Sequence, residues 1–427
     1  MLILSNVLEA LGKLKGKIKN VVIFISDSLR WDYTPVEVKK LGITFKTIAA
    51  SIFTASSVPS IITGLYPYNH RVYSFLDKMP RNIFSILDFP GYDISIWCEN
   101  TWTDWRPKGY SQIHEILQFK VAKSLEELRP PFIYIEDEKG GHCPYGWTEN
   151  DVYRESDCLS FFKDYGRKSI AELRERYKRG IKRSVEIFRK RIKILEEKDV
   201  INNTLIIFTS DHGELLGEYG GLVGHGNITT PELVYVPTIL IHPDIPKEDY
   251  SNEGVIRHVD IFPTILDLLG YDVSMLRVEG VSLLKAKTLP SYGKSYFKIK
   301  RSKHVFIEKG VWDINGGYVF REGSWAIWLS RLILFVMGPL ANPSRIESIY
   351  LKERLKKYPY EALREYPKLV KIVSARVLKF GNPIINLNTA RKIASEFKID
   401  ITNVYALKVK TAMLRKHLKE YKSVDLT

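Results

Sequence analysis

A run of β-branched and aromatic residues leads directly into one acidic residue in NVVIFISD, residues 20–27. Such a nearly continuous apolar run is typical of a β-strand that is buried on both faces of a sheet. In a parallel sheet covered by helices, functional groups gather just beyond the carboxyl ends of the strands. Asp27 is therefore a candidate functional residue, together with the polar side chains that follow other strands of this kind.

Four further apolar runs have the same character, at residues 93–98, 131–136, 204–210 and 236–241. Helical patterns separate the runs, at residues 54–64, 81–89, about 165–198 and 258–270. Strands that alternate with helices predict an α/β fold, in which a mainly parallel (mixed) central sheet carries helices on both faces.

Polar side chains follow three of these runs at the point where each run ends. They are Asp27 after the first run, Glu136, Asp137, Glu138 and His142 at the end of the third, and Asp211, His212 and Glu214 after the fourth. An aspartate at such a point is commonly an N-cap, but several strand ends of this kind are harder to explain by capping alone. Carboxylates with an imidazole suit a divalent cation such as Mg²⁺, Mn²⁺, Ca²⁺ or Zn²⁺. Such a cation would lower the pKa of a serine hydroxyl and neutralise an anionic substrate.

The stretch FTASSVPSIITGLYPYNHRV, residues 53–72, supplies hydroxyl groups at the start of a predicted helix, with Ser56 and Ser57 just before Pro59. One interpretation is capping, because serine and threonine satisfy the free amides at helix starts. The other is a nucleophile, because the positive end of the helix dipole stabilises negative charge. The serines alone do not decide between the two roles.

Five stretches in order carry a resemblance to a known family. They are NVVIFISDSLRWDY (20–33), TASSVPSIITGLYPYNHRV (54–72), GGHCPYGW (140–147), TLIIFTSDHGELLGE (204–218) followed by GHGN (224–227), and RHVDIFPTILDLLGYD (257–272) with EGVSLL (279–284). The chain resembles the sulfatase branch of the alkaline phosphatase/sulfatase superfamily. The resemblance implies an alkaline-phosphatase-like fold and a metal-dependent hydrolase that acts on a small anionic ester.

The resemblance also implies a nucleophile and a metal site. The family's nucleophile lies two positions before the proline, which here assigns the role to Ser57 and leaves Ser56 as a helix cap or as a hydroxyl that supports the site from behind. The implied metal ligands are Asp27, Ser57, Asp211 and His212. The implied cofactor is one divalent ion, Ca²⁺, Mg²⁺ or Mn²⁺ with Zn²⁺ as a further candidate, or a pair of ions.

Four histidines besides His212 fall within the matching stretches. His142 and His225 align with positions that hold the oxygens of the transferred group and protonate the leaving group. Glycines flank His225 in GHGN and suit a close approach to substrate. His70 and His258 are interpreted as structural residues.

Two departures from the family pattern bear on the chemistry. Ile61 stands where sulfatases carry the arginine of the motif that directs conversion of the nucleophile to formylglycine, so an unmodified Ser57 is expected. Ser28 stands where many sulfatases carry a second aspartate. In addition, Glu138 and His142 resemble the Asp-x-x-x-His metal motif of nucleotide phosphodiesterases, which would imply a second metal and phosphoryl chemistry.

The first functional prediction is a sulfuric ester hydrolase that acts through Ser57 or its formylglycine form. The alternative is a phosphodiesterase or phosphotransferase of the same superfamily with an unmodified Ser57. A second alternative is a membrane- or nucleic-acid-binding protein on a degenerate sulfatase fold. Retention of every aligned metal position argues against degeneracy.

Charge is distributed unevenly along the 427 residues. Residues 301–427 carry 24 Lys and Arg against 11 Asp and Glu, which leaves most of the net charge of +15 in this segment. We therefore predict an N-terminal amphipathic segment (1–19), a catalytic domain (20–300) and a basic, largely helical C-terminal region (301–427). The basic region could meet an anionic membrane surface, with nucleic acid as a less favoured partner.

Three cysteines without a C-x-x-C pair favour a reducing compartment, so a cytoplasmic location is expected, with membrane association as an addition. The apolar stretch WAIWLSRLILFVMGPLANP, residues 325–343, contains Arg331 and is interrupted by Gly338-Pro339, which makes it short for a membrane span. It is predicted to be a buried helix, and an interfacial membrane helix is the second interpretation.

Overall fold

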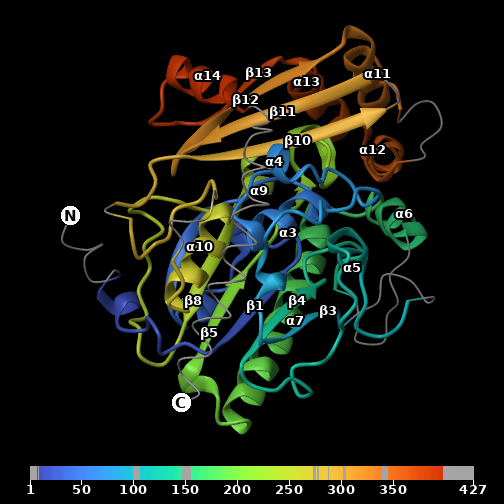
Figure 1. Ribbon diagram of the computed structural model, residues 1–427. Helices are drawn as coiled ribbons and strands as arrows, with labels where there is room; N and C mark the ends of the chain where they lie inside the picture. Colours follow the sequence, from blue (N-terminus) through green and yellow to red (C-terminus); the bar gives the residue numbers. More distant parts are fainter. Residues whose placement is uncertain are drawn as a thin grey trace, which may run out of the picture.

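The structure is a computed structural model. It describes residues 7, 9–99, 106–146, 155–272, 276, 278–286, 288–301, 304–338 and 345–397. A seven-stranded sheet forms its centre (Figure 1). The strand order is β3 (Asp93–Trp97), β4 (Phe132–Glu138), β1 (Asn20–Ser26), β5 (Thr204–Thr209), β8 (Tyr235–Ile241), β2 (Ile43–Ile48) and β9 (Ile256–Arg257).

The predicted α/β fold with a mainly parallel, mixed sheet is confirmed. Strand β1 pairs in parallel with β4 and β5, and β3 pairs in parallel with β4. Strand β8 runs antiparallel to both of its neighbours, β5 and β2. The five apolar runs correspond to β1, β3, β4, β5 and β8, whereas the sequence analysis missed β2, whose ITFKTI is interrupted by a lysine.

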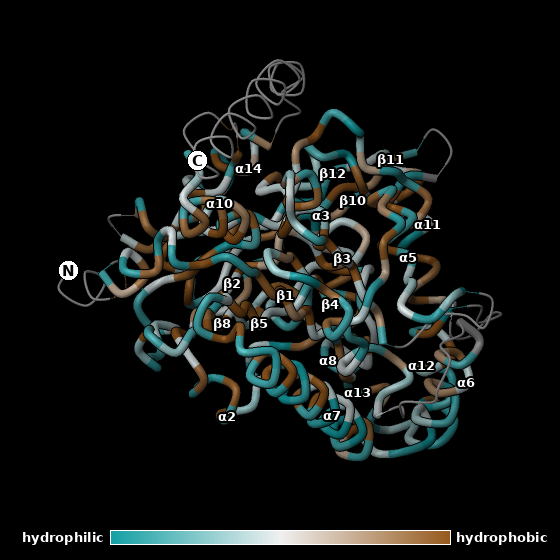
Figure 2. Tube along the Cα trace, turned by 60° about the horizontal axis from the view of Figure 1, so that its bottom comes forward, coloured by the Kyte–Doolittle hydropathy of each residue, from teal (hydrophilic) through white to brown (hydrophobic). Residues whose placement is uncertain are grey.

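Helices cover both faces of the sheet. Val21, Ile23 and Ile25 of β1 belong to one buried cluster with the helices α3 (Thr54–Thr63), α5 (Gln112–Leu117) and α10 (His258–Leu268). Val22 and Phe24 belong to a second cluster with the long helix α7 (Ile170–Glu197) and with α6 (Glu155–Tyr165). This division follows from the strand period of two, which sends alternate side chains to opposite faces. Figure 2 shows α7 at the edge of the molecule, with hydrophilic and hydrophobic residues alternating along it.

A second, four-stranded antiparallel sheet lies at one end of the molecule, at the top of Figure 1. Its order is β10 (Gly293–Arg301), β11 (His304–Trp312), β12 (Gly316–Gly323) and β13 (Val377–Gly381). The helices α11 (Trp325–Val336), α12 (Ile346–Lys357), α13 (Pro359–Ser374) and α14 (Leu387–Ser395) accompany it. The second sheet thus begins at Gly293, a few residues before the domain boundary predicted at residue 300, and the C-terminal region contains strands as well as helices.

Short elements complete the described chain. They are α2 (Val36–Lys39), α4 (Pro67–His70), α8 (Glu218–Gly221), α9 (Pro231–Val234), and the strands β6 (Leu215–Gly217) and β7 (Leu222–Gly224). Among residues 81–89, only Ile86–Asp88 forms a short 3-10 helix, so the longer helix predicted there is wrong. In the predicted N-terminal segment, Leu11, Leu14 and Ile18 pack into the main core.

Helix α11 is not the buried helix expected from its composition. Ile327, Arg331 and Phe335 are buried, whereas Trp325, Leu329, Ile333 and Met337 are exposed, with Trp325 75% exposed. These four residues follow at intervals of four and lie on one side of the helix. In the described part of the chain, every helix is too short or too polar to cross a membrane.

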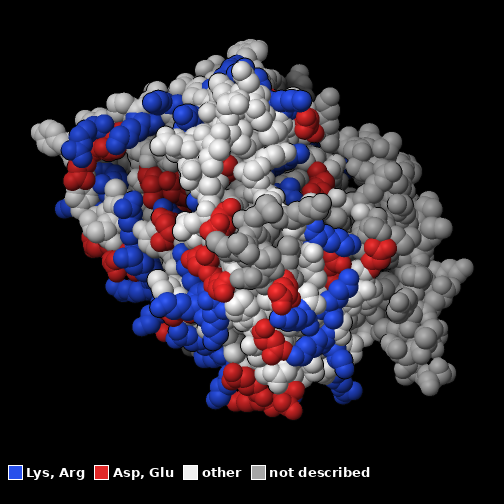
Figure 3. Space-filling view, turned by 90° about the vertical axis from the view of Figure 1, so that its left-hand side faces the viewer, with Lys and Arg blue, Asp and Glu red and all other residues white. Residues whose placement is uncertain are grey.

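Basic and acidic side chains are interspersed on the face of the molecule that Figure 3 shows. Among the described residues, ion pairs at the surface include Lys13 with Glu9 and Lys123 with Asp93. Most pairs of this kind are solvent-exposed and contribute little to stability.

Candidate active site

Two adjacent parallel strands bring three polar residues to one edge of the sheet. Asp27 follows β1, and Asp211 and His212 follow β5, which pairs with β1 in parallel register. All three are fully buried, and one ligand atom from each lies within 4.8 Å of the others. The structure therefore brings together three of the four side chains that the resemblance implied as metal ligands.

The donor atoms of this cluster fit a cation. Asp211 Oδ1 accepts hydrogen bonds from the amides of Ser28 (3.1 Å) and His212 (2.9 Å), while Oδ2 is buried without a hydrogen-bond partner among the described residues. His212 Nδ1 lies 2.9 Å from the carbonyl oxygen of Gly213, to which it donates, so Nε2 carries the free lone pair. Burial and the adjacent Asp27 carboxylate raise the pKa of Asp211 to about 8. A divalent cation would satisfy Asp211 Oδ2 and relieve this repulsion.

A lysine lies against the same cluster. Lys139 Nζ is 2.9 Å from Asp27 Oδ2 and 2.8 Å from Asp137 Oδ2, and the lysine is 6% exposed. Burial raises the pKa of Asp27, but the charges of Lys139 and the nearby histidines outweigh it and hold that pKa below its usual range. Asp27 is therefore ionised, and its two carboxylate oxygens can bind a cation and accept a hydrogen bond from Lys139 at the same time.

Thr54, not Ser57, presents its hydroxyl to the cavity beside this cluster. Thr54 is the first residue of α3, and its Oγ1 lies 3.1 Å from His212 Nε2. Ser57 Oγ instead donates to the main-chain carbonyl of Asp211 (2.6 Å), and its fully buried side chain does not line the cavity. The geometry thus does not support Ser57 as nucleophile or as metal ligand. Ser56 Oγ donates to Ser51 Oγ (2.7 Å) near the helix start, away from the cavity.

The predicted helix start at residue 54 favoured Thr54, whereas the spacing to Pro59 favoured Ser57. The helix was predicted to begin at residue 54, and it does. A hydroxyl on the first helical residue lies at the positive end of the dipole, whereas a hydroxyl three residues later lies about 4.5 Å deeper along the axis. Helix α3 is followed by Gly64, whose φ of 69° is the left-handed conformation that glycine adopts readily.

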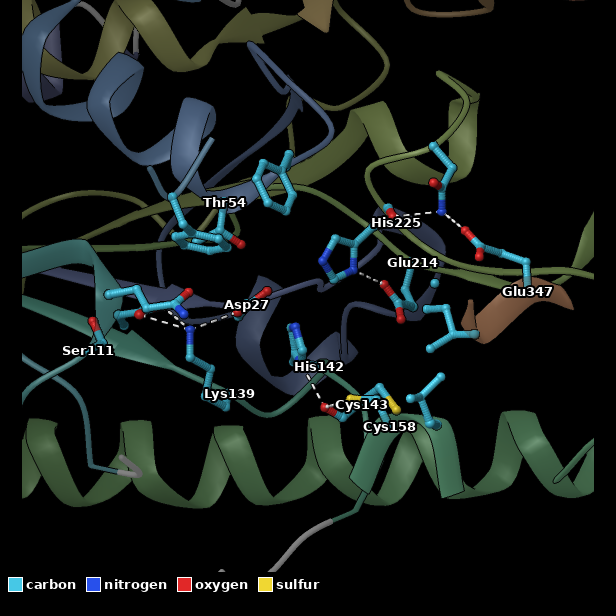
Figure 4. Close-up of a pocket in the computed structure, with 18 of the residues that line it drawn as sticks. Asp27, Thr54, Ser111, Lys139, His142, Cys143, Cys158, Glu214, His225 and Glu347 are labelled. Carbon is cyan, nitrogen blue, oxygen red and sulfur yellow. Dashed lines mark hydrogen bonds and ion pairs between the residues drawn. The ribbon is translucent and has the colours of Figure 1, made fainter. Parts of the chain in front are cut away.

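Two histidines whose pKa values are shifted in opposite directions face each other in the cavity (Figure 4). The rings of His142 and His225 are 5.1 Å apart, and His225 Nδ1 lies 2.7 Å from Glu214 Oε2. Burial lowers the pKa of His225, but the Glu214 carboxylate outweighs it and raises that pKa to about 9. Burial lowers the pKa of His142 to about 4. His225 is therefore a proton donor at neutral pH and His142 is neutral.

Glu214 is a site residue to which the sequence analysis gave no role. Besides its contact with His225, its Oε1 accepts a hydrogen bond from Tyr145 Oη at 2.6 Å. Tyr145 lies in the GGHCPYGW stretch, so two separate motifs meet at this carboxylate. The sequence feature that pointed to Glu214 was its position three residues after Asp211.

The second metal predicted at Glu138 and His142 is not supported. Glu138 Oε2 accepts from the amide of Gly140 (2.9 Å), and burial raises the pKa of this carboxyl to about 8. Its side chain contacts Ser184 of α7, on the other face of the sheet, and it does not line the cavity. The groups that could hold a metal in the described part of the chain include neither Glu138 nor His142.

The cavity has a volume of about 420 Å³ and draws its walls from distant parts of the chain. Asp27, Thr54, Lys139, His142, Glu214 and His225 line one part of it. Arg345, Ile346 and Glu347, at the start of α12, line another. Asn227 donates to Glu347 Oε1 and accepts from Arg345, which ties the loop after His225 to the C-terminal region. These C-terminal residues were not among the site residues predicted from the sequence.

The catalytic region matches the family model Sulfatase over residues 19–271. The chain belongs to the sulfatase family. This sulfatase-family chain is 31% identical over 388 residues to the low-salt glycan biosynthesis sulfotransferase Agl7 of Haloferax volcanii, covering 88% of this chain and 90% of that protein. The predicted membership in the alkaline phosphatase/sulfatase superfamily is confirmed, as is the prediction of an ester hydrolase.

Solved structures share the fold of this sulfatase-family chain. A 2-O GAG sulfatase superposes with a TM-score of 0.55 at 17% identity, covering 88% of this chain and 100% of that one. A protein solved in complex with its substrate D-glucosamine-2-N,6-O-disulfate superposes with a TM-score of 0.50 at 16% identity, covering 83% and 98%. At these identities, the likeness concerns the fold alone.

Proposed function

We propose that this enzyme cleaves a sulfuric ester with the unmodified hydroxyl of Thr54 as the nucleophile. The observation that carries the proposal is the position of Thr54 Oγ1, at the first residue of α3, in the cavity and 3.1 Å from His212 Nε2. The start of a ten-residue helix supplies free amides and a positive dipole end, which stabilise the negative charge that develops on the transferred group.

The proposed metal site consists of Asp27, Asp211 and His212. Two carboxylates and one imidazole suit Mg²⁺, Mn²⁺ or Ca²⁺, and Zn²⁺ is compatible with the same set. When bound, the cation supplies positive charge that lowers the pKa of the Thr54 hydroxyl and neutralises the ester oxygens. Lys139, held against Asp27, adds a second positive charge on the cavity wall.

The proposed chemistry has two steps. Thr54 reacts as its alkoxide, its oxygen bonds to the sulfur, and the bond from sulfur to the ester oxygen breaks while His225 gives its proton to the leaving oxygen. An acceptor hydroxyl then attacks the sulfur, its proton returns to His225, and the Thr54 oxygen leaves as the alkoxide. The Glu214–His225 pair supports this use of His225, because the carboxylate keeps the imidazole protonated until substrate arrives.

The second candidate function is transfer of the sulfo group to a sugar hydroxyl. Formylglycine can release sulfate by breaking a carbon–oxygen bond of its hydrate, but a plain threonine has no such route. The group then stays on Thr54 until an acceptor attacks the sulfur, and that acceptor is water in a hydrolase or an alcohol in a transferase. The name of the sulfotransferase relative favours this candidate. An unmodified hydroxyl also serves phosphoryl transfer, which keeps the phosphate-ester alternative as a third candidate.

A substrate screen on the metal-loaded enzyme tests the proposal. Aryl sulfate, phosphate monoester, phosphate diester and phosphonate ester are compared with Mg²⁺, Mn²⁺, Ca²⁺ and Zn²⁺, with and without a glycan acceptor. We expect the sulfate ester to be cleaved, and an acceptor that raises the rate and appears sulfated in the products would establish transfer. A preference for a phosphate ester by more than about a hundredfold would replace the sulfuric ester assignment.

We also propose a cytoplasmic location with association at a membrane surface. The chain has three cysteines and no C-x-x-C pair, which supports a reducing compartment. The exposed apolar side of α11 and the basic balance of residues 301–427 support contact with anionic lipid over contact with nucleic acid.

A further inference from the structure

A second cavity, of about 540 Å³, adjoins the catalytic one. Phe53 lines both cavities, and Gly226, which lines the second, directly follows His225. The other walls come from residues 71–77, which follow α4, and from Phe297–Lys300 of β10. We call this second cavity the basic groove. It offers space next to the reacting ester that the proposed chemistry does not use.

Three cationic side chains line the basic groove: Arg71, Lys298 and Lys300. Within the described residues, none of the three forms an ion pair with a carboxylate. Asp77 is the acidic residue of the groove, and its Oδ2 is occupied by the amides of Tyr73 (2.8 Å) and Ser74 (2.9 Å). The groove therefore carries a net positive charge that a bound anion would neutralise.

Lys298 is held in place by an aromatic ring. Its Nζ lies 4.2 Å from the centroid of Tyr73, and the side chain is half-buried. Burial, reinforced by the neighbouring charge of Lys300, lowers the pKa of Lys298 below its usual value. A positioned ammonium that is partly desolvated and repelled by a second lysine gains more from an anionic ligand than a free surface lysine does.

We propose that the basic groove binds an anionic saccharide unit adjacent to the one that carries the scissile ester. This inference rests on the proposed function, because it assigns the substrate of the same site to the anionic glycans. A small monoester would be held entirely by the catalytic cavity and would leave the three cations without a role. The half-buried Tyr73 adds aromatic surface of the kind that packs against sugar rings, and the cations pair with sulfate or carboxylate groups on the ring.

The test is direct binding, which requires no turnover. Dextran sulfate oligosaccharide is titrated into the Mn²⁺-loaded enzyme by calorimetry, with neutral dextran of the same length as the comparison. The groove variant is Lys298→Gln with Lys300→Gln, and Arg71→Gln, an exposed position, is a second variant that spares the strand. The matched control is Lys182→Gln with Arg189→Gln, which removes the same charge from exposed positions of α7.

We expect the double groove variant to bind dextran sulfate at least about tenfold more weakly than wild type, and Arg71→Gln to weaken it in the same direction. The control variant should bind as wild type does, and neutral dextran should bind none of the proteins. Equal losses in the groove and control variants, or unchanged binding in both groove variants, would overturn the inference. Selective binding by an enzyme that cleaves no sulfate ester would keep the groove and reject the proposed function instead.

Discussion

Thr54 Oγ1 lies 3.1 Å from His212 Nε2, and the two residues, 158 positions apart in the sequence, come from the start of a helix and the end of a strand. The contact places the hydroxyl that we propose as the nucleophile beside the side chains that would hold a metal.

Loss of a metal ligand should abolish turnover without unfolding the protein. Asp211→Asn and His212→Ala each remove a donor at the end of β5, outside the main apolar core. We expect bound Mn²⁺, measured by elemental analysis, to fall below about a tenth of an equivalent, with the far-UV circular dichroism unchanged. Near-wild-type metal content in either variant would place the metal elsewhere.

Removing the proton donor should matter most for poor leaving groups. His225→Gln deletes the imidazolium that Glu214 maintains, and general acid catalysis is worth roughly 10²–10⁴-fold. We expect a loss of this size with an alkyl sulfate and a much smaller loss with 4-nitrophenyl sulfate, whose phenolate leaves without help. The raised pKa of His225, about 9, also predicts that the alkyl sulfate rate falls as the pH rises through that value. Equal losses on the two esters would remove His225 from the role of acid.

Glu138 should affect stability and leave metal binding intact. Burial raises its pKa from 4.5 to about 8, so the folded protein keeps a proton that the unfolded chain has released between those two values. Stability should therefore fall as the pH rises from about 4.5 to about 8. In Glu138→Gln this part of the pH dependence should disappear from thermal unfolding curves, while Mn²⁺ content stays that of wild type. Metal loss in this variant would restore the second metal site.

The start of α12 should control substrate affinity. Arg345 lines the cavity and contacts Asn227 Oδ1, in the loop after His225. We expect Arg345→Gln to raise KM for an anionic ester by about tenfold and to change kcat less. The reason is that the side chain binds a part of the substrate that is distant from the bond that breaks. Lys356→Gln, on the same helix but outside the cavity, is the control. A fall in kcat with KM unchanged would contradict this role.

The fold and the metal cluster were accessible from the sequence for one reason. Apolar runs that end in Asp27 and in Asp211-His212 identify the carboxyl ends of parallel strands, and such ends meet at one edge of a sheet. The same logic fails for Glu138, because alternate residues of a strand face opposite ways: Asp137 lines the cavity, while Glu138 faces α7. The period of two along a strand is enough to place Glu138 on the face opposite to Asp137.

Other parts of the site depend on information that local patterns do not carry. Ser57 and Thr54 differ by less than one helical turn, and the choice between them depends on where the helix starts relative to the sheet edge. Arg345 and Glu347 reach the cavity through long-range packing of the second region against the first. The spacing of the motif near Pro59 predicts neither where the helix starts relative to the sheet edge nor how the C-terminal region packs against the cavity.

The nucleophile is the central claim, and turnover by three variants of α3 tests it most directly. Thr54→Ala, Thr54→Ser and Ser57→Ala are assayed as metal-loaded proteins on one sulfate ester, after thermal unfolding has confirmed that each is folded. We predict that Thr54→Ala loses at least about a thousandfold in kcat, that Thr54→Ser retains measurable turnover, and that Ser57→Ala stays within about tenfold of wild type. A fully active Thr54→Ala, or loss of turnover in Ser57→Ala alone, would contradict the account and return the role to Ser57.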